Sequence, residues 1–599
     1  MTILLHLHLL LLFIVLFPLA TSAQSPPEIV RGEESWRITI DDKTALTFSP
    51  NAFLTAHIEK EKVKSGFGSY TFKQNVKTRY KNPSVDSIVH VGKETKMYGQ
   101  LHHKQKKVHF DLTLVRENNS KLRFACYVDH PQINRVIFRF QRRMDEQYSH
   151  VNLTGHRVPA LVEEQGIGRG DQSTSFWTGI VGAAGDAFTS YAPIPFFLTT
   201  EGRAVFLENT RPSVCDFSQE GQVVLEVQHN SLKGLVWLKD DPLALLRSYT
   251  VHAGRMRSLP DWAYGTWLGV QGGAKRVRSI VDSTLASGNP VKAVWIQDWT
   301  GNRDVAVGNR LWWNWQPDTN AYPDLERFCK RMNERGVHVL GYINAFIAEG
   351  TKRAQEAIDK GYLVLNPKGE PYLLKQGGFK AYTVDLTNPD ARKWYKGIIK
   401  RQMVDKGFSG WMADFGEWLP MDAQLASGIS AKEYHNRFPV EWARLNREVL
   451  EEAEQSEDMV FFTRSGFSHS PKHSTLFWAG DQTVDYGRHD GMPSAVAAML
   501  SSGMSGITLN HSDIGGYTSI KALLLNKTRD RDLFYRWAEM NAFTPVFRTH
   551  EGLHPEANFQ YYNDSSAQQF FARLGRIHHR LKDFFQELTE EASQKGWPV

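Results

Sequence analysis

The stretch GWMADFGEWLP, residues 410–420, is a short apolar run that ends in a carboxylate, Asp414. A second run of the same kind, LFWAGDQ at 476–482, leads to Asp481. Each run is short, rich in aromatic side chains and bounded by glycine. This pattern is typical of a buried strand that delivers an Asp at its C-terminal end.

Further apolar runs surround these two, and helical patterns alternate with them. The predicted strands are 263–270, 292–297, 338–343, 410–413, 459–463, 475–480, 506–510 and 544–547. Predicted helices include 275–287, 324–335 and 391–405. Eight strands that alternate with helices predict an α/β domain of the (β/α)8 TIM-barrel type.

Polar residues follow each predicted strand. In chain order they are Gln271, Gln297, Asn344, Asp414, Arg464, Asp481, His511 and Arg548. Polar loops alone would explain one or two of these positions, but Gln and Arg fit that explanation less well. Because a TIM barrel builds its active site at the C-terminal ends of its strands, we expect these side chains to converge there.

The residues before the barrel have a different pattern. From about 35 to 240, short runs of alternating polarity predict an antiparallel β-sandwich. A helix predicted at 241–256 then leads into the barrel. We therefore predict a sandwich at 24–250 and a barrel at 251–599. An insertion is expected at about 345–408, because this stretch is too long for a loop and contains the hairpin-like YLVLNPKGEPYLL.

Composition limits the classes of function. The chain has 599 residues, 41% of them hydrophobic, and a net charge of +6. This charge is mild for the length, so the Lys-rich segments near 59–81 and 102–107 are interpreted as solvated strand faces, and no nucleic-acid partner is expected. The three cysteines allow at most one disulfide, and no Cys/His spacing predicts a metal site or a cofactor.

The N-terminus resembles a targeting signal. Residues 3–20 are apolar and 21–23 are small, which predicts a signal peptide at 1–23. The protein is then expected to be secreted or lumenal, with a lysosomal or digestive location among the options. No stable membrane span is expected after cleavage. An uncleaved anchor is the alternative, because about 18 apolar residues just span a bilayer. Five sequons predict a glycoprotein, and they begin at Asn118, Asn152, Asn510, Asn526 and Asn563. A glycan on Asn510 would block chemistry, because this residue lies in a predicted catalytic motif.

Two carboxylates at strand ends suggest glycoside hydrolysis. One group must protonate the leaving oxygen while another attacks or stabilises the anomeric carbon. Asp414 and Asp481 can take these parts, with one kept ionised and the other given a raised pKa by burial. A helix cap would be the simple alternative for a lone Asp after a strand.

The motifs WMADFGEWLP, FFTRSG, FWAGDQ and HSDIGGY resemble those of glycoside hydrolase family 31, retaining α-glycosidases with a β-sandwich before the barrel. The resemblance implies that Asp414 is the nucleophile and Asp481 the acid/base. It also implies that Arg464 lies near the nucleophile and the sugar hydroxyls, and that His550 in FRTHE binds a sugar hydroxyl.

One segment narrows the expected substrate within that family. This segment is residues 295–315, WIQDWTGNRDVAVGNRLWWNW. It resembles the segment with which sulfoquinovosidases bind a sulfonate, and the resemblance implies that Gln297, Arg310 and Trp313 bind the sulfonate here. Gln271 and Tyr517 match the accompanying positions. A sulfonate is a fixed anion that only accepts hydrogen bonds, so Arg, indole, phenol and amide donors suit it. An aromatic sugar platform with a stacked Arg is the simpler interpretation of 310–315.

These observations predict a retaining α-glycosidase that acts on sulfoquinovosides, as the glycerol conjugate or the sulfolipid. An α-glucosidase or α-xylosidase of the same family, or a non-catalytic sugar-binding relative, is the alternative. Family members usually continue into C-terminal β-domains, whereas this sequence ends after a helix predicted at 567–595. The sequence therefore predicts that a C-terminal β-domain is missing, and it does not indicate an oligomeric state.

Overall fold

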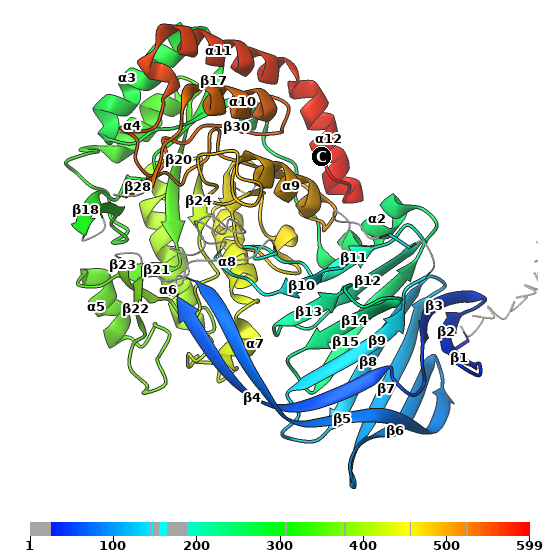
Figure 1. Ribbon diagram of the computed structural model, residues 1–599. Coiled ribbons are helices and arrows are strands. Elements are labelled where there is room, and N and C mark those ends of the chain that lie inside the picture. Colours follow the sequence, from blue (N-terminus) through cyan, green and yellow to red (C-terminus); the bar gives the residue numbers. More distant parts are fainter. Residues whose placement is uncertain are drawn as a thin grey trace, which may run out of the picture.

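The computed structural model describes residues 25–66, 68–143, 146–147, 155–164, 188–305, 308–376, 379–455, 457–522 and 525–599. Figure 1 shows a β-rich N-terminal domain, in blue to green, beside a larger α/β domain that continues to the C-terminus. The predicted signal peptide and the sequon at Asn152 lie outside the described residues.

The N-terminal domain is a β-sandwich, as predicted. Along β7 (Lys106–Asn118) and β8 (Lys121–Asp129), buried residues alternate with more exposed ones, so each strand has one buried face. Phe124 stacks on Phe138 of β9 (Arg135–Gln141) with 5.9 Å between ring centroids, which joins the two layers in one core.

The strands of the sandwich follow a simple arrangement. One layer contains β10 (Arg157–Ala160), β13 (Ser213–Asp216), β14 (Gln222–Val227), β9 (Arg135–Gln141) and β4 (Leu54–Gly66). The other contains β6 (Glu94–His103), β7, β8, β15 (Ser231–Leu238), β12 (Arg203–Leu207) and β11 (Phe196–Leu198). The long β5 (Ser69–Val91) pairs with both β4 and β6 and so connects the layers. A small sheet of β1 (Glu28–Arg31), β2 (Trp36–Ile40) and β3 (Lys43–Phe48) precedes them.

Eight parallel strands form the barrel, and each overlaps one of the eight predicted runs. Their order is β30 (Phe547–Arg548), β16 (Thr266–Gly269), β17 (Val291–Trp295), β20 (His338–Asn344), β24 (Gly410–Asp414), β25 (Val460–Thr463), β26 (Leu476–Trp478) and β27 (Asn510–His511). Between the first and last strands, a parallel bridge joins Ile514 to Thr549. The strands are almost wholly buried, as expected of a barrel enclosed by helices.

Helices cover the outside of the barrel (Figure 1). They are α3 (Gly273–Ala286), α4 (Leu325–Asn333), α6 (Pro389–Gln402), α8 (Phe438–Glu452), α9 (Met492–Gly503) and α10 (Arg531–Asn541), with α2 (Pro242–Ala253) before the first strand and the short α7 (Ala431–Tyr434) before α8. The helices predicted at 241–256, 275–287, 324–335 and 391–405 correspond to α2, α3, α4 and α6.

The single helix predicted at 567–595 is wrong. The structure has two helices, α11 (Ser565–Arg580) and α12 (Lys582–Lys595), separated at Leu581. The Leu581 amide donates to the carbonyl of His578, which tightens the last turn of α11 and ends it. The bend allows Phe585 to pack against His578, with 5.2 Å between ring centroids.

Additional elements follow β20. They are β21 (Phe346–Ala348), α5 (Lys352–Asp359), β22 (Leu373–Gln376) and β23 (Phe379–Thr383), and the three strands form one small sheet. The hairpin-like segment of the sequence contains an antiparallel bridge between Leu365 and Pro371. A second small hairpin, β18 (Asn302–Val305) with β19 (Gly308–Leu311), follows β17; β28 (Ile520–Ala522) pairs with β29 (Leu525–Lys527) after β27.

The β4–β5 hairpin of the sandwich reaches across to the barrel (Figure 1). Near its tip, the Tyr70 hydroxyl donates to the carbonyl of Leu419 at 2.9 Å, in the loop that follows β24. The Tyr70 amide donates to the carboxylate of Glu163 at 2.8 Å, within the segment that follows β10. One hairpin therefore holds a barrel loop and a sandwich segment together.

Candidate active site

The two aspartates lie where the sequence predicts, at the C-terminal end of the barrel. Asp414 is the last residue of β24, and Asp481 follows β26 after a two-residue turn. Phe415, directly after Asp414, has a positive φ of 61°, a conformation that non-glycine residues rarely adopt. Such strain is often found at functional sites, where the surrounding structure enforces it.

Arg464, after β25, joins the two aspartates. Its Nε is 3.2 Å from Asp414 Oδ1, and its Nη1 is 2.8 Å from Asp481 Oδ2. The guanidinium also lies 4.5 Å from the ring centroids of Phe415 and Tyr191, which face it from the barrel and from the sandwich domain. One buried cation therefore fixes the positions of both carboxylates.

Three further groups contact Arg464, and the sequence analysis assigned none of them a role. Glu417 accepts from Nη2 at 2.7 Å and Glu164 accepts from the same nitrogen at 3.0 Å. The Tyr191 hydroxyl lies 3.4 Å from Nη1 and also donates to Glu164. Glu417 lies inside the motif that carries Asp414. Glu164 and Tyr191 belong to the sandwich domain, and no local pattern in the sequence distinguishes them.

This cluster brings four carboxyl groups to one guanidinium, and the pKa values of Asp481, Glu164 and Asp414 are raised. Burial raises the pKa of Asp481 to about 7, and the charges of Asp414 and Glu417 add to the effect while Arg464 opposes it. Burial, together with Glu417 and Asp481, raises the pKa of Glu164 to about 8 against the same opposition. Asp481 is therefore suited to carry a proton near neutral pH and to donate it.

Asp414 has more donors around its carboxylate. Burial raises its pKa, but Arg464, the Tyr342 hydroxyl at 2.7 Å and the Phe415 amide at 2.8 Å all favour the charged form. The Tyr342 hydroxyl in turn accepts from Asn344 at 3.1 Å, which fixes its orientation. Hydrogen bonds to a carboxylate stabilise the anion, so this environment favours Asp414 as the ionised partner of the pair.

His550 and the two predicted glutamines lie at the ends of neighbouring strands. His550 Nδ1 accepts from the Gly552 amide at 2.9 Å, and its ring packs edge-on against Trp295 with 4.8 Å between centroids. Burial holds its pKa well below the ordinary value, so the imidazole is neutral and its other nitrogen can donate. Gln297 is 9% exposed after β17, whereas the Gln271 backbone amide is bound to Glu551 at 2.9 Å.

Two of the predicted sulfonate residues, Arg310 and Trp313, lie at one aromatic ring. Trp313 stacks on Phe379 of β23 with 4.2 Å between centroids, and the Arg310 guanidinium lies 5.9 Å from the same ring. Trp313 also packs against Phe415, beside the Asp414 turn, at 5.5 Å. Its indole N–H is buried and has no hydrogen-bond partner within the described parts of the chain. A buried donor without a partner is costly, and an acceptor on a ligand would satisfy it.

Tyr517 connects this group to the aspartates. Its ring lies 4.7 Å from that of His550, and burial raises its pKa, with the negative charge of Asp481 adding and the positive charge of Arg310 opposing. Tyr517 is thus within electrostatic reach of both the acid/base candidate and the predicted sulfonate cation. Contacts therefore connect Asp414, Arg464 and Asp481, Trp313 lies beside the Asp414 turn, and Tyr517 lies beside His550, whereas Gln271 and Gln297 are placed only by the strands that precede them.

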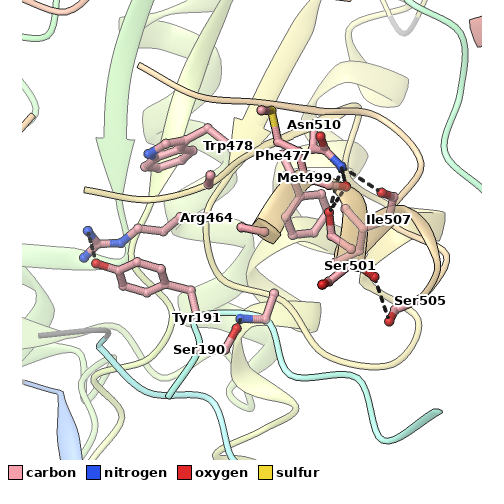
Figure 2. A pocket seen from close by; sticks show the side chains of 14 residues that line it. Ser190, Tyr191, Arg464, Phe477, Trp478, Met499, Ser501, Ser505, Ile507 and Asn510 are labelled. Carbon is pink, nitrogen blue, oxygen red and sulfur yellow. Dashed lines mark hydrogen bonds between the residues drawn. The ribbon is translucent and has the colours of Figure 1, made fainter. Parts of the chain in front are cut away.

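A cavity of about 150 Å³ lies behind Arg464, between α9 and the strands β26 and β27 (Figure 2). Figure 2 shows Arg464 and Tyr191 at one end and Asn510 at the other. The Asn510 side-chain amide donates to Ser502 Oγ at 2.7 Å and to the carbonyl of Met499 at 3.1 Å. These bonds occupy the nitrogen that a glycan would need.

Among the described residues, no group of three or more potential ligands could hold a metal ion. No helix in the described ranges is both long and apolar enough to cross a membrane. The three cysteines, Cys126, Cys215 and Cys329, are each buried and free.

The sequence and the fold both have known relatives. A sulfoquinovosidase of Escherichia coli (strain K12) is 36% identical over 82% of this chain and 73% of its own length. One of Agrobacterium fabrum is 36% identical over 78% of this chain and 71% of its own length. A solved family 31 sulfoquinovosidase from E. rectale, in complex with an aza-sugar inhibitor, has a TM-score of 0.89 and 34% identity, covering 96% of this chain and 86% of that one.

A family model covers most of the α/β domain. Residues 256–588 match the TIM-barrel domain of glycosyl hydrolases family 31. The match spans more than half of the chain and includes the strands that carry Asp414, Arg464 and Asp481. This protein therefore belongs to glycoside hydrolase family 31.

Proposed function

We propose that this enzyme is a retaining α-glycosidase that hydrolyses α-sulfoquinovosides, such as sulfoquinovosyl glycerol or sulfoquinovosyl diacylglycerol, and releases sulfoquinovose. The observation that carries the proposal is the buried indole N–H of Trp313, which has no hydrogen-bond partner among the described residues. Trp313 stacks on the ring that Arg310 approaches, and the charge of Arg310 acts on Tyr517. The E. coli and A. fabrum relatives, both sulfoquinovosidases, support the same substrate.

The aspartates perform the reaction in two steps. The Asp414 carboxylate attacks the anomeric carbon and forms a glycosyl ester, while Asp481 gives its proton to the departing glycosidic oxygen. Asp481, now ionised, takes a proton from water, and the water oxygen attacks the anomeric carbon and releases Asp414. Two inversions give net retention of the α configuration. The raised pKa of Asp481 suits the first step, because the group must enter it protonated.

The sulfonate explains the donors opposite the aspartates. Arg310 supplies a planar, permanently charged fork, and the Trp313 indole and Tyr517 phenol supply single donors. A neutral glucose 6-hydroxyl needs no such cation. An α-glucosidase or α-xylosidase of the same family, or a non-catalytic sugar-binding relative, remains the alternative that the experiment must reject.

Two substrates with the same aryl leaving group test the proposal, an α-sulfoquinovoside and an α-glucoside. Arg310→Ala should cost on the order of 2–5 kcal/mol in transition-state binding of the sulfoquinovoside, and Arg310→Lys should already be costly. Trp313→Phe and Tyr517→Phe should each cost about 1–2 kcal/mol, for one lost donor. A wild-type preference for the glucoside, or equal damage to both substrates by Arg310→Ala, would establish the alternative.

We also propose that the enzyme is a glycoprotein of the secretory pathway, secreted or lumenal, with the signal peptide removed. The apolar run at 3–20 supports this proposal. Among the sequons, Asn118, Asn526 and Asn563 are exposed, whereas the side chain of Asn510 is engaged in the fold. Expression in a eukaryotic secretory host, followed by glycosidase digestion and mass spectrometry, should find glycans at the exposed positions and none at Asn510.

A further inference from the structure

The hairpin that carries Arg310 holds a second arginine directly opposite it. Arg303 on β18 and Arg310 on β19 are register partners in this antiparallel pair. Side chains that are directly opposite in an antiparallel pair lie on the same face, about 5 Å apart at their Cβ atoms, and like charges there are destabilising. A two-stranded hairpin with two arginines at one register position therefore requires an explanation.

Acidic groups of the protein compensate Arg303 only weakly. Within the described ranges it has no hydrogen bond and no carboxylate within 4.0 Å, and its Nε is buried without a partner. The acidic group that acts on it is Glu349, which lies 3.9 Å from the ammonium of Lys380. Partial burial lowers the pKa of Arg303, because it removes water from the cation. Arg303 is thus a partly desolvated cation that has no carboxylate partner among the described residues.

The surroundings indicate which anion would fit. Arg310, on the same face, approaches the ring of Phe379, and Trp313 stacks on that ring while its own N–H has no partner among the described residues. The register therefore places a second arginine on the face of the hairpin that carries Arg310, and Arg310 lies beside the Phe379 ring on which Trp313 stacks. An anion placed between two guanidinium groups reduces their repulsion and accepts charge-assisted hydrogen bonds. A sulfonate has three acceptor oxygens and a fixed negative charge, which matches such a set of donors.

We propose that Arg303 is a specificity-determining residue, and that with Arg310 it forms a two-arginine site for the sulfonate of the substrate. The proposal rests on the proposed function and adds a residue to its binding site. In this arrangement Arg310 provides the fork next to Trp313, and Arg303 approaches the sulfonate from the opposite strand. Arg303 makes no contribution to the chemistry at the anomeric carbon.

Paired kinetics of Arg303→Gln test this role. The substrates are an α-sulfoquinovoside and an α-glucoside with the same aryl leaving group, and the readout is the ratio of their kcat/KM values. The ratio should fall on the order of 10- to 100-fold, mainly through a higher KM for the sulfoquinovoside. Arg303→Lys should recover part of the loss, because it keeps the charge without the fork.

Lys380→Gln is the matched control. Lys380 lies next to Phe379 on β23 and its side chain is 62% exposed, so this variant also removes one positive charge near the hairpin. If the ratio depends on position and not on net charge, it should stay within about 2-fold of wild type in this variant. Equal losses in Arg303→Gln and Lys380→Gln would reduce the effect to general electrostatics and overturn the proposal.

Thermal unfolding separates a binding role from a structural one. Because Arg303→Gln removes a like-charge pair, the ligand-free variant should unfold at the wild-type temperature or slightly above it. A lower unfolding temperature, together with losses on both substrates, would identify Arg303 as a structural residue and overturn the proposal.

The outcome also distinguishes this proposal from the proposed function. If Arg310→Ala lowers the substrate ratio and Arg303→Gln leaves it unchanged, the sulfonate specificity stands and the role of Arg303 is wrong. If wild-type enzyme prefers the glucoside, the proposed function itself is wrong.

Discussion

Replacing Glu164 by Gln tests how the sandwich domain controls proton transfer in the barrel. The substitution preserves the size of the side chain, and an amide can still bond to Tyr191 and Trp418, which now contact the carboxyl group. It removes one of the four carboxylates that share Arg464. The cation can then stabilise the Asp481 anion more strongly, so the pKa of Asp481 should fall.

The contacts give the size of this effect. Glu164 and Asp481 bind Nη2 at 3.0 Å and Nη1 at 2.8 Å, so their oxygens are about 5–6 Å apart. At an effective dielectric constant of about 20, two full charges at that separation repel by roughly 3 kcal/mol. This energy corresponds to a maximum shift of about 2 pH units in the pKa of Asp481. With a pKa of about 8, Glu164 is only partly ionised where Asp481 titrates, at about 7. The pKa of Asp481 should therefore fall by on the order of 0.5–1 pH unit in Glu164→Gln.

The assay is kcat/KM against pH with an alkyl α-sulfoquinovoside, whose departure needs a proton. Activity falls as Asp481 loses its proton, so the alkaline limb should lie at lower pH in Glu164→Gln. An aryl substrate with an activated leaving group should show a smaller change. Glu163→Gln is the matched control, since Glu163 is the adjacent carboxylate and binds the Tyr70 amide. An unmoved limb in Glu164→Gln, or the same displacement in both variants, would refute the reasoning.

Three further outcomes follow from the site. Asp414→Asn should lower turnover by several orders of magnitude on every substrate while substrate binding persists. Asp481→Asn should reduce turnover less for substrates with aryl leaving groups than for those with alkyl ones. Equal, mild losses in both variants would contradict the assignment of Asp414 as nucleophile and Asp481 as acid/base. Because the folded-state pKa values of Glu164 and Asp481 are raised, the stability that these groups contribute is complete below about pH 4 and is lost as pH rises towards 8. Calorimetry should show the unfolding temperature falling over this range, and falling less steeply in Glu164→Gln. Equal slopes in the variant and the wild type would contradict this prediction. Tyr70→Phe should lose about 1–2 kcal/mol of stability, because the buried carbonyl of Leu419 loses its donor, and denaturant unfolding with no change would show that the contact is dispensable.

The barrel could be predicted from the sequence because its signals are local. Runs such as 410–413 and 459–463 are buried on both faces, so they are uniformly apolar and easily recognised. The break at Leu581 could not be predicted, because no Gly or Pro marks it and the bend follows from the packing of Phe585 on His578. Tertiary contacts decided that boundary, and local propensity did not.

The candidate site likewise combines residues that the sequence predicts with residues that only the structure identifies. Asp414, Arg464 and Asp481 follow strands of one barrel, so their convergence follows from the fold. Glu164 lies 300 positions before Arg464 in the chain, in an irregular segment, and only the docking of the sandwich brings it to the guanidinium. Glu417 was present in a recognised motif, but its bond to Arg464 became evident only in three dimensions.

The two domains therefore share one buried charge cluster. Arg464 from the barrel is 2% exposed at its side chain and is enclosed on one side by Tyr191 and Glu164 of the sandwich. Without the sandwich, water would reach this cation and more of the Asp481 side chain, which is now 32% exposed, and the burial that raises the pKa of Asp481 would be reduced. An acid that must be protonated near neutral pH would then be ionised. In the proposed mechanism, the sandwich is thus a part of the candidate active site, because it supplies a low-dielectric wall and a competing carboxylate that favour the protonated form of Asp481.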